Sequence, residues 1–123
     1  MRKEVADMWV AALRSGEYAQ TKQFLRKGGG FCCLGVLCDL HQRRTNAGAW
    51  KDHEDGLEAV YQTGNTSNDA SRTCLPKGVY EWADCSDDPS DAEVGLPLAV
   101  LNDDHGYTFD QLADVIEKHW GDL

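Results

Sequence analysis

The sequence predicts a single α+β domain over residues 1–123, with helices at both ends, a central cysteine-bearing helix and a small antiparallel sheet. Near both ends, apolar residues recur at the three- and four-residue spacing of an amphipathic helix. Between them, loosely alternating segments flanked by glycines are typical of short strands. A chain of 123 residues, 41% of them hydrophobic, is long enough for one packed core and short for two.

The first helix is predicted over residues 3–14, where Val5, Trp9 and Leu13 fall on one face and Ser15-Gly16 forms a stop signal. Residues 17–26 show no clear period and are expected to form a short strand or turn. The three glycines at 28–30 then form a tight connection.

The central helix is predicted from Cys32 or Cys33 to His41. Its apolar stripe comprises Cys33, Val36, Leu37 and Leu40. A glycine inside a helix usually marks close packing, so we expect Gly35 to lie against another element.

The second half of the chain is predicted to contain more loop. Residues 45–64 fit two short strands, with a hairpin as one way of pairing them, and a polar loop follows at 64–71. Residues 75–83 fit a short helix with Pro76 at its start, followed by an acidic loop at 84–93 and one or two helical turns at 96–102. Thr108 and Gln111 have the spacing of a capping box. The buried stripe of the final helix is Phe109, Leu112, Ala113, Ile116 and Trp120.

The net charge of −9 is unevenly distributed along the chain. Residues 1–44 carry eight basic and four acidic side chains, a net +4, whereas the rest carries four basic and seventeen acidic, a net −13. Such a chain repels a long nucleic acid, but its basic segment can still bind a small anion.

We expect an intracellular, cytoplasmic protein that does not enter a membrane. No apolar run reaches the roughly 18 residues that a membrane span needs, and the N-terminus begins an amphipathic pattern. Five cysteines, two of them adjacent, do not indicate a disulfide framework, so reduced thiols are expected.

The segment Phe31–Leu40, FCCLGVLCDL, is the most specific motif of the chain. It combines with matching residues on both sides, which are Trp9, Leu13, Ser15-Gly16, Tyr18, Gln20, Leu25, Leu75-Pro76, Trp82, Leu101-Asn102-Asp103, Gly106, Phe109 and Ile116. Together they resemble a family of small, mostly uncharacterised phage and prophage proteins. The resemblance implies a viral accessory protein, acting in an infected or lysogenic bacterial host. Such proteins frequently work by binding, either blocking a host defence protein or sequestering a small nucleotide signal.

Three kinds of chemistry are possible from the residue types: a cysteine nucleophile, a zinc site and a calcium site in the acidic loop. Cys32 or Cys33 at a helix start is a candidate nucleophile, which would make the protein a cysteine hydrolase. Cysteine is also among the most often buried residues, and this core role is favoured for Cys32, Cys33 and Cys38. Paired zinc-ligand spacing is missing, and the acidic loop does not fit a calcium-binding template. We therefore predict no catalytic residue, no metal site and no cofactor.

The favoured function is sequestration, without cleavage, of a small anionic, nucleotide-like ligand by a homo-oligomer. Basic side chains neutralise phosphates, aromatic rings stack on a base and amides hydrogen-bond its edge. The candidate ligand-binding residues are Tyr18, Gln20, Arg26, Arg43, Trp50, Asn102 and Asp103. For Asn102 and Asp103, a buried hydrogen-bonding role before the last helix is the competing interpretation. The alternative function is an acidic protein that masks a host defence protein.

Overall fold

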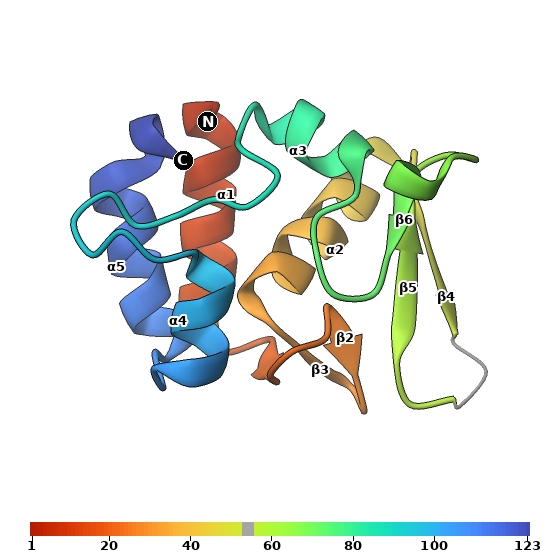
Figure 1. Ribbon diagram of the computed structural model, residues 1–123, viewed down its shortest axis with the longest axis horizontal. Helices are drawn as coiled ribbons and strands as arrows, with labels where there is room; N and C mark the ends of the chain where they lie inside the picture. Colours follow the sequence, from red (N-terminus) through yellow and green to blue (C-terminus); the bar gives the residue numbers. More distant parts are fainter. Residues whose placement is uncertain (53–55) are drawn as a thin grey trace.

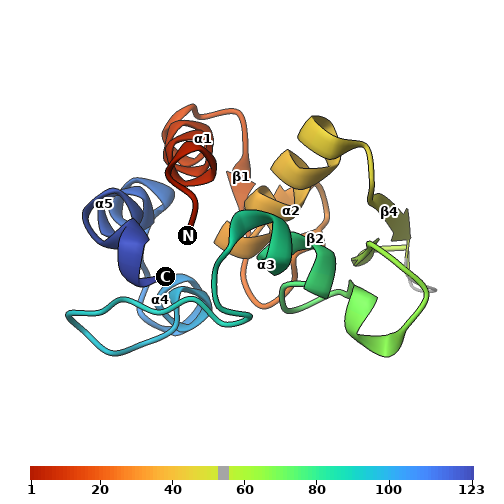
Figure 2. The ribbon, with the colours of Figure 1, turned by 90° about the horizontal axis from the view of Figure 1, so that it is seen from above.

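The computed structural model describes residues 1–52 and 56–123, and confirms the predicted α+β class. In chain order the described elements are α1 (Lys3–Arg14), β1 (Ala19–Gln20), β2 (Arg26–Lys27), β3 (Gly30–Phe31), α2 (Cys33–Thr45), β4 (Ala49–Asp52), β5 (Ala59–Gln62), η1 (Ser67–Asp69), β6 (Ala70–Ser71), α3 (Lys77–Ala83), α4 (Leu98–Asp104), α5 (Phe109–His119) and η2 (Trp120–Asp122). Helices α1 and α5 lie side by side at one end of the molecule, the hairpin of β4 and β5 lies at the other, and α2 runs between them (Figures 1 and 2).

Helix α1 has the amphipathic character that its sequence predicts. Val5, Trp9 and Leu13 are all buried. The indole Nε1 of Trp9 also donates a hydrogen bond of 2.9 Å to the backbone carbonyl of Cys33, at the start of α2. This bond satisfies the polar atom of a fully buried ring and fixes the start of α2 against α1.

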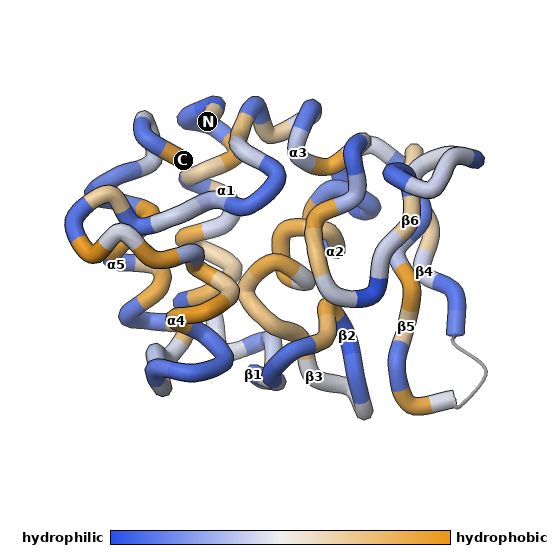
Figure 3. Tube along the Cα trace, viewed as in Figure 1, coloured by the Kyte–Doolittle hydropathy of each residue, from blue (hydrophilic) through white to orange (hydrophobic). Residues whose placement is uncertain are grey.

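Helix α2 is longer and more buried than the sequence predicts. It continues past His41 to Thr45, and Leu34 and Cys38, outside the predicted stripe, are as buried as the residues within it. Leu40, inside the predicted stripe, is only half-buried. Figure 3 shows that much of α2 is hydrophobic, as expected for a helix in the centre of the molecule. A helix enclosed by elements on several sides has no single apolar face, so its periodicity underestimated its burial.

Gly35 is the point of closest approach on α2, as predicted. A Cβ atom built there would lie 1.7 Å from the backbone carbonyl oxygen of Leu25. The segment between β1 and β2 therefore packs directly on the helix backbone, which requires a residue without a side chain.

Two three-stranded sheets replace the single antiparallel sheet that was predicted. One has the order β1-β3-β2, with β1 parallel and β2 antiparallel to β3. The other is antiparallel with the order β4-β5-β6, which confirms the hairpin within residues 45–64. Its connection includes residues 53–55, outside the described residues. The predicted polar loop at 64–71 in fact contains η1 and β6.

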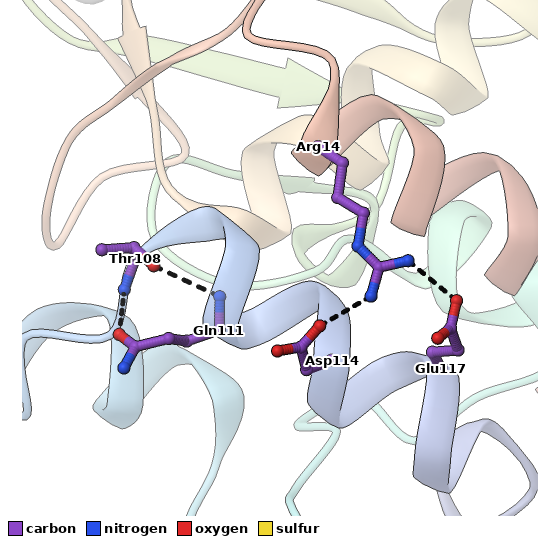
Figure 4. A network of polar contacts seen from close by, with 5 residues as sticks. All are labelled: Arg14, Thr108, Gln111, Asp114 and Glu117. Atoms are coloured by element: carbon purple, nitrogen blue, oxygen red, sulfur yellow. Dashed lines mark hydrogen bonds and ion pairs between the residues drawn. The ribbon is translucent and has the colours of Figure 1, made fainter.

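The C-terminal helices follow the sequence signals closely. Pro76 is the N-cap of α3. The capping box of α5 is formed as predicted: the Thr108 hydroxyl accepts from the Gln111 backbone N–H at 3.2 Å, and the Gln111 side-chain oxygen accepts from the Thr108 N–H at 2.9 Å (Figure 4). Trp120 lies beyond the end of α5, in η2, and is half-buried.

Arg14 joins α1 to α5 on the surface. Its guanidinium contacts Asp114 at 2.6 Å and Glu117 at 2.8 Å (Figure 4). These carboxylates raise the pKa of Arg14, whose charge pairs are exposed and therefore screened by salt.

Candidate functional site

Three of the seven candidate residues converge on one carboxylate that the sequence analysis did not single out, Asp39 of α2. The Tyr18 hydroxyl donates to Asp39 Oδ2 at 2.6 Å, and the Trp50 indole N–H donates to Asp39 Oδ1 at 3.1 Å. Arg43 Nε lies 3.1 Å from Asp39 Oδ2. Only 8% of Asp39 is exposed, so these three donors compensate the burial of its charge.

Phe31 and Arg26 complete the group. The Phe31 ring lies 5.1 Å from the Tyr18 ring and 5.9 Å from the Trp50 ring, both edge-on. The Arg26 guanidinium lies 5.2 Å from the centre of the Phe31 ring and 5.6 Å from that of Trp50. We call these six residues, Tyr18, Arg26, Phe31, Asp39, Arg43 and Trp50, the Asp39 cluster.

Local structure explains how residues so distant in sequence meet. Arg26 of β2 pairs in register with Phe31 of β3, which places their side chains together. Asp39 and Arg43 are four residues apart on α2 and therefore share one face of the helix. Trp50 comes from the hairpin, where its ring packs 4.8 Å from that of Tyr61. The cluster thus joins both sheets to the central helix.

The cluster is cationic in an acidic protein. It contains two guanidinium groups and one carboxylate, and Arg26 forms no ion pair with any residue in 1–52 or 56–123. Arg43 contacts Asp39 through Nε, and its side chain is 64% exposed. Burial, together with the hydrogen bond to Asp39, raises the pKa of Tyr18, which therefore remains a neutral donor. The exposed Arg43 and the half-buried Arg26, which has no carboxylate partner in the described parts of the chain, are suited to an anion.

The other three candidates, Gln20, Asn102 and Asp103, form a separate network. Asn102 is fully buried, and its Oδ1 accepts from Gln20 Nε2 at 2.9 Å and from the Cys33 backbone N–H at 3.3 Å. Its Nδ2 donates to the Thr21 carbonyl at 3.0 Å and to Asp103 Oδ1 at 2.8 Å. These bonds use both donors and both acceptor positions of the amide. Asn102 therefore fixes α4 to β1 and to the start of α2, which favours the structural interpretation over ligand recognition.

The cysteines of the motif lie in the core. Cys32, Cys33 and Cys38 are all at most 3% exposed. Burial raises the pKa of Cys32 to about 11 and the pKa values of Cys33 and Cys38 well above the ordinary value. Their thiols are protonated at neutral pH, which weakens the hydrolase alternative. Within residues 1–52 and 56–123, no three His, Cys, Asp or Glu side chains are placed to hold a metal ion.

Two clefts lie away from the Asp39 cluster, and none of the seven candidate residues lines either of them. The first, of about 390 Å³, lies between the η1–β6 segment and Tyr80 of α3, with Asp87 and Asp88 at its wall. Burial and the neighbouring Asp87 raise the pKa of Asp88. Carboxylates at the wall make this cleft unsuited to an anion. The second, of about 330 Å³, is an open cleft along the start of β4 and the end of β5.

Sequence reasoning missed Asp39 and Phe31, although both stand in the FCCLGVLCDL motif. The spacing of Asp39 and Arg43 was a usable signal, because residues four apart on a helix form ion pairs. The role of Phe31 had no comparable signal, since its ring contacts depend on strand pairing between β2 and β3.

Comparisons with known proteins give a family but no activity. No helix of the described chain has the length and apolar character to cross a membrane. No match to a curated protein or to a solved structure was found. A family model described as a domain of unknown function, DUF8296, matches residues 1–120, nearly the whole chain. The chain therefore belongs to the DUF8296 family.

Proposed function

We propose that this protein binds a small anionic, nucleotide-like ligand at the Asp39 cluster and holds it without cleaving it. The observation that supports this most is the convergence of Tyr18, Arg26, Arg43 and Trp50 from four separate segments of the chain. Cations beside aromatic rings provide both kinds of contact that a nucleotide needs, charge-assisted hydrogen bonds to phosphate and stacking on a base.

The residue types in the cluster support retention rather than cleavage. None of its six members is a histidine, cysteine or serine that could serve as base or nucleophile. Its one carboxylate, Asp39, already accepts from Tyr18, Trp50 and Arg43. A carboxylate so occupied acts as a fixed anchor for the donors around it.

The biological setting in this proposal is a phage accessory role, in which the ligand is a small nucleotide signal of the host. The support is the resemblance carried by the FCCLGVLCDL motif. A homo-oligomer is part of the proposal, because a second copy placed over the cluster would enclose a ligand that one small domain leaves exposed.

Titration calorimetry against a panel of linear and cyclic nucleotides tests the binding. We expect Arg43→Gln to weaken binding of the best ligand by about tenfold or more, since it removes charge-assisted hydrogen bonds. The matched control is Lys3→Gln, which removes one exposed positive charge paired with Asp7 on α1. Equal weakening by both variants, or no heat with any nucleotide, would contradict the proposal.

Native mass spectrometry of the protein purified from cells with an active nucleotide-signalling defence tests retention and assembly. An oligomer whose extra mass is released unaltered by heat is the expected result. A released but chemically altered molecule would point to catalysis. A monomer without small ligand, together with a host protein that co-purifies at low salt and dissociates at high salt, would favour the masking alternative.

A further inference from the structure

The guanidinium of Arg26 covers the aromatic surface on which a base would stack. It lies over the rings of both Phe31 and Trp50, at 5.2 and 5.6 Å from their centres. A planar cation on an aromatic face occupies the same space as a stacked base. In the ligand-free protein, therefore, this surface is already occupied by a side chain of the same chain.

The two sides of this contact differ in how firmly they are held. Trp50 is held by its hydrogen bond to Asp39 and by packing against the Tyr61 ring at 4.8 Å. Arg26 is a long, flexible side chain with no carboxylate partner in the described parts of the chain. When something competes for the Trp50 surface, the guanidinium is the group that moves.

Resting on the proposed function, we infer that Arg26 is a latch that makes the site selective for phosphorylated ligands. In the empty site its guanidinium lies on Trp50 and Phe31. When a nucleotide binds, the base takes that place and the guanidinium pairs with the phosphate. An unphosphorylated nucleoside displaces the same side chain but offers no anion in return. The latch therefore disfavours nucleosides relative to nucleotides.

A ligand-free measurement tests whether Arg26 covers Trp50. Quenching of tryptophan fluorescence by neutral acrylamide is compared between the wild-type protein and Arg26→Ala. We expect stronger quenching in Arg26→Ala, and no such increase when the same change is made in a Trp50→Phe background. The background variant accounts for the signal of Trp9, Trp82 and Trp120. Unchanged quenching in Arg26→Ala would overturn the latch whatever the ligand is.

Binding of adenosine and adenosine 5′-monophosphate, measured by calorimetry, tests the selectivity. Arg26→Ala is expected to bind adenosine about tenfold more tightly than the wild type, because no cation–π contacts have to be broken. The monophosphate gains nothing or weakens, because the guanidinium that would pair with it is gone. Lys27→Ala is the matched control, because it removes one positive charge from the same strand, β2. The Lys27 ammonium lies over the Phe24 ring, 4.9 Å from its centre, and not over Phe31 or Trp50.

The outcomes separate the latch from the function on which it rests. Adenosine binding that is unchanged or weaker in Arg26→Ala, with the monophosphate still bound by the wild type, overturns the latch and leaves the proposed function. Failure of the wild type to bind the monophosphate or any other nucleotide overturns both proposals.

Discussion

At the scale of single residues, the sequence indicates the chemistry of a side chain but not the group that the side chain contacts. The residue types of Tyr18, Arg43 and Trp50 predict nucleotide binding, and in the structure all three contact Asp39. The residue type of Asn102 predicts the same role, yet every hydrogen-bonding group of its side-chain amide is used within the chain. An amide that recognises a ligand and an amide that joins two elements look alike in sequence.

The thiols provide a residue-scale prediction. With a colorimetric thiol reagent at pH 8, we expect one fast-reacting cysteine, the exposed Cys74, because burial raises the pKa of Cys32, Cys33, Cys38 and Cys85. Cys74→Ser should remove the fast phase, and unfolding in denaturant should release the remaining thiols. A fast phase that persists in Cys74→Ser and is lost in Cys32→Ser or Cys33→Ser would revive the hydrolase alternative.

At the scale of elements, local signals predicted where helices begin better than how they are buried. The capping box at Thr108 and the stop after α1 depend on neighbouring residues, and both are found as predicted. Helix α2 is enclosed on several sides, so more of its residues are buried than the predicted apolar stripe contains. The parallel pairing of β1 with β3 was not predicted. Each strand has only two residues, which is too short for a recognisable alternating pattern.

Gly35→Ala tests the packing of α2 at the element scale. The new methyl group would meet the Leu25 carbonyl oxygen at 1.7 Å, and backbone atoms cannot rotate out of the way. We expect a loss of about 3 kcal/mol or more in the free energy of unfolding, measured by urea denaturation. The control is Gly121→Ala in η2, where a Cβ would meet nothing within 4 Å. Equal stability of the two variants would show that Leu25 does not pack on the helix backbone.

At the scale of the whole molecule, a buried histidine links the stability of the fold to pH. His41 of α2 is 4% exposed, and its Nδ1 lies 2.6 Å from the Tyr61 hydroxyl of β5. Burial lowers the pKa of His41, so the unfolded chain binds its proton more readily than the folded one. The stability that this group contributes is complete above its ordinary pKa of about 6.5 and is lost as the pH falls below that value.

His41→Gln should therefore reduce the loss of stability between pH 7.5 and 5.5, as measured by urea midpoints at both values. Exposed His105 provides the control, because His105→Gln should keep the wild-type difference. The carboxylates whose pKa values are lowered, Asp69 and Glu93, lose their contribution at lower pH, below this window. A difference between the two pH values that is identical in all three proteins would exclude His41 as the cause.

The sequence by itself determined the α+β class, the two terminal helices, the close approach at Gly35 and the capping box of α5. Each depends on periodicity or on residues a few positions apart, where local geometry is decisive. Only the tertiary structure decided that Asp39 gathers Tyr18, Arg43 and Trp50 while Asn102 is used internally. Those contacts join residues brought together by packing, and residue type and spacing carry little information about which distant groups will meet.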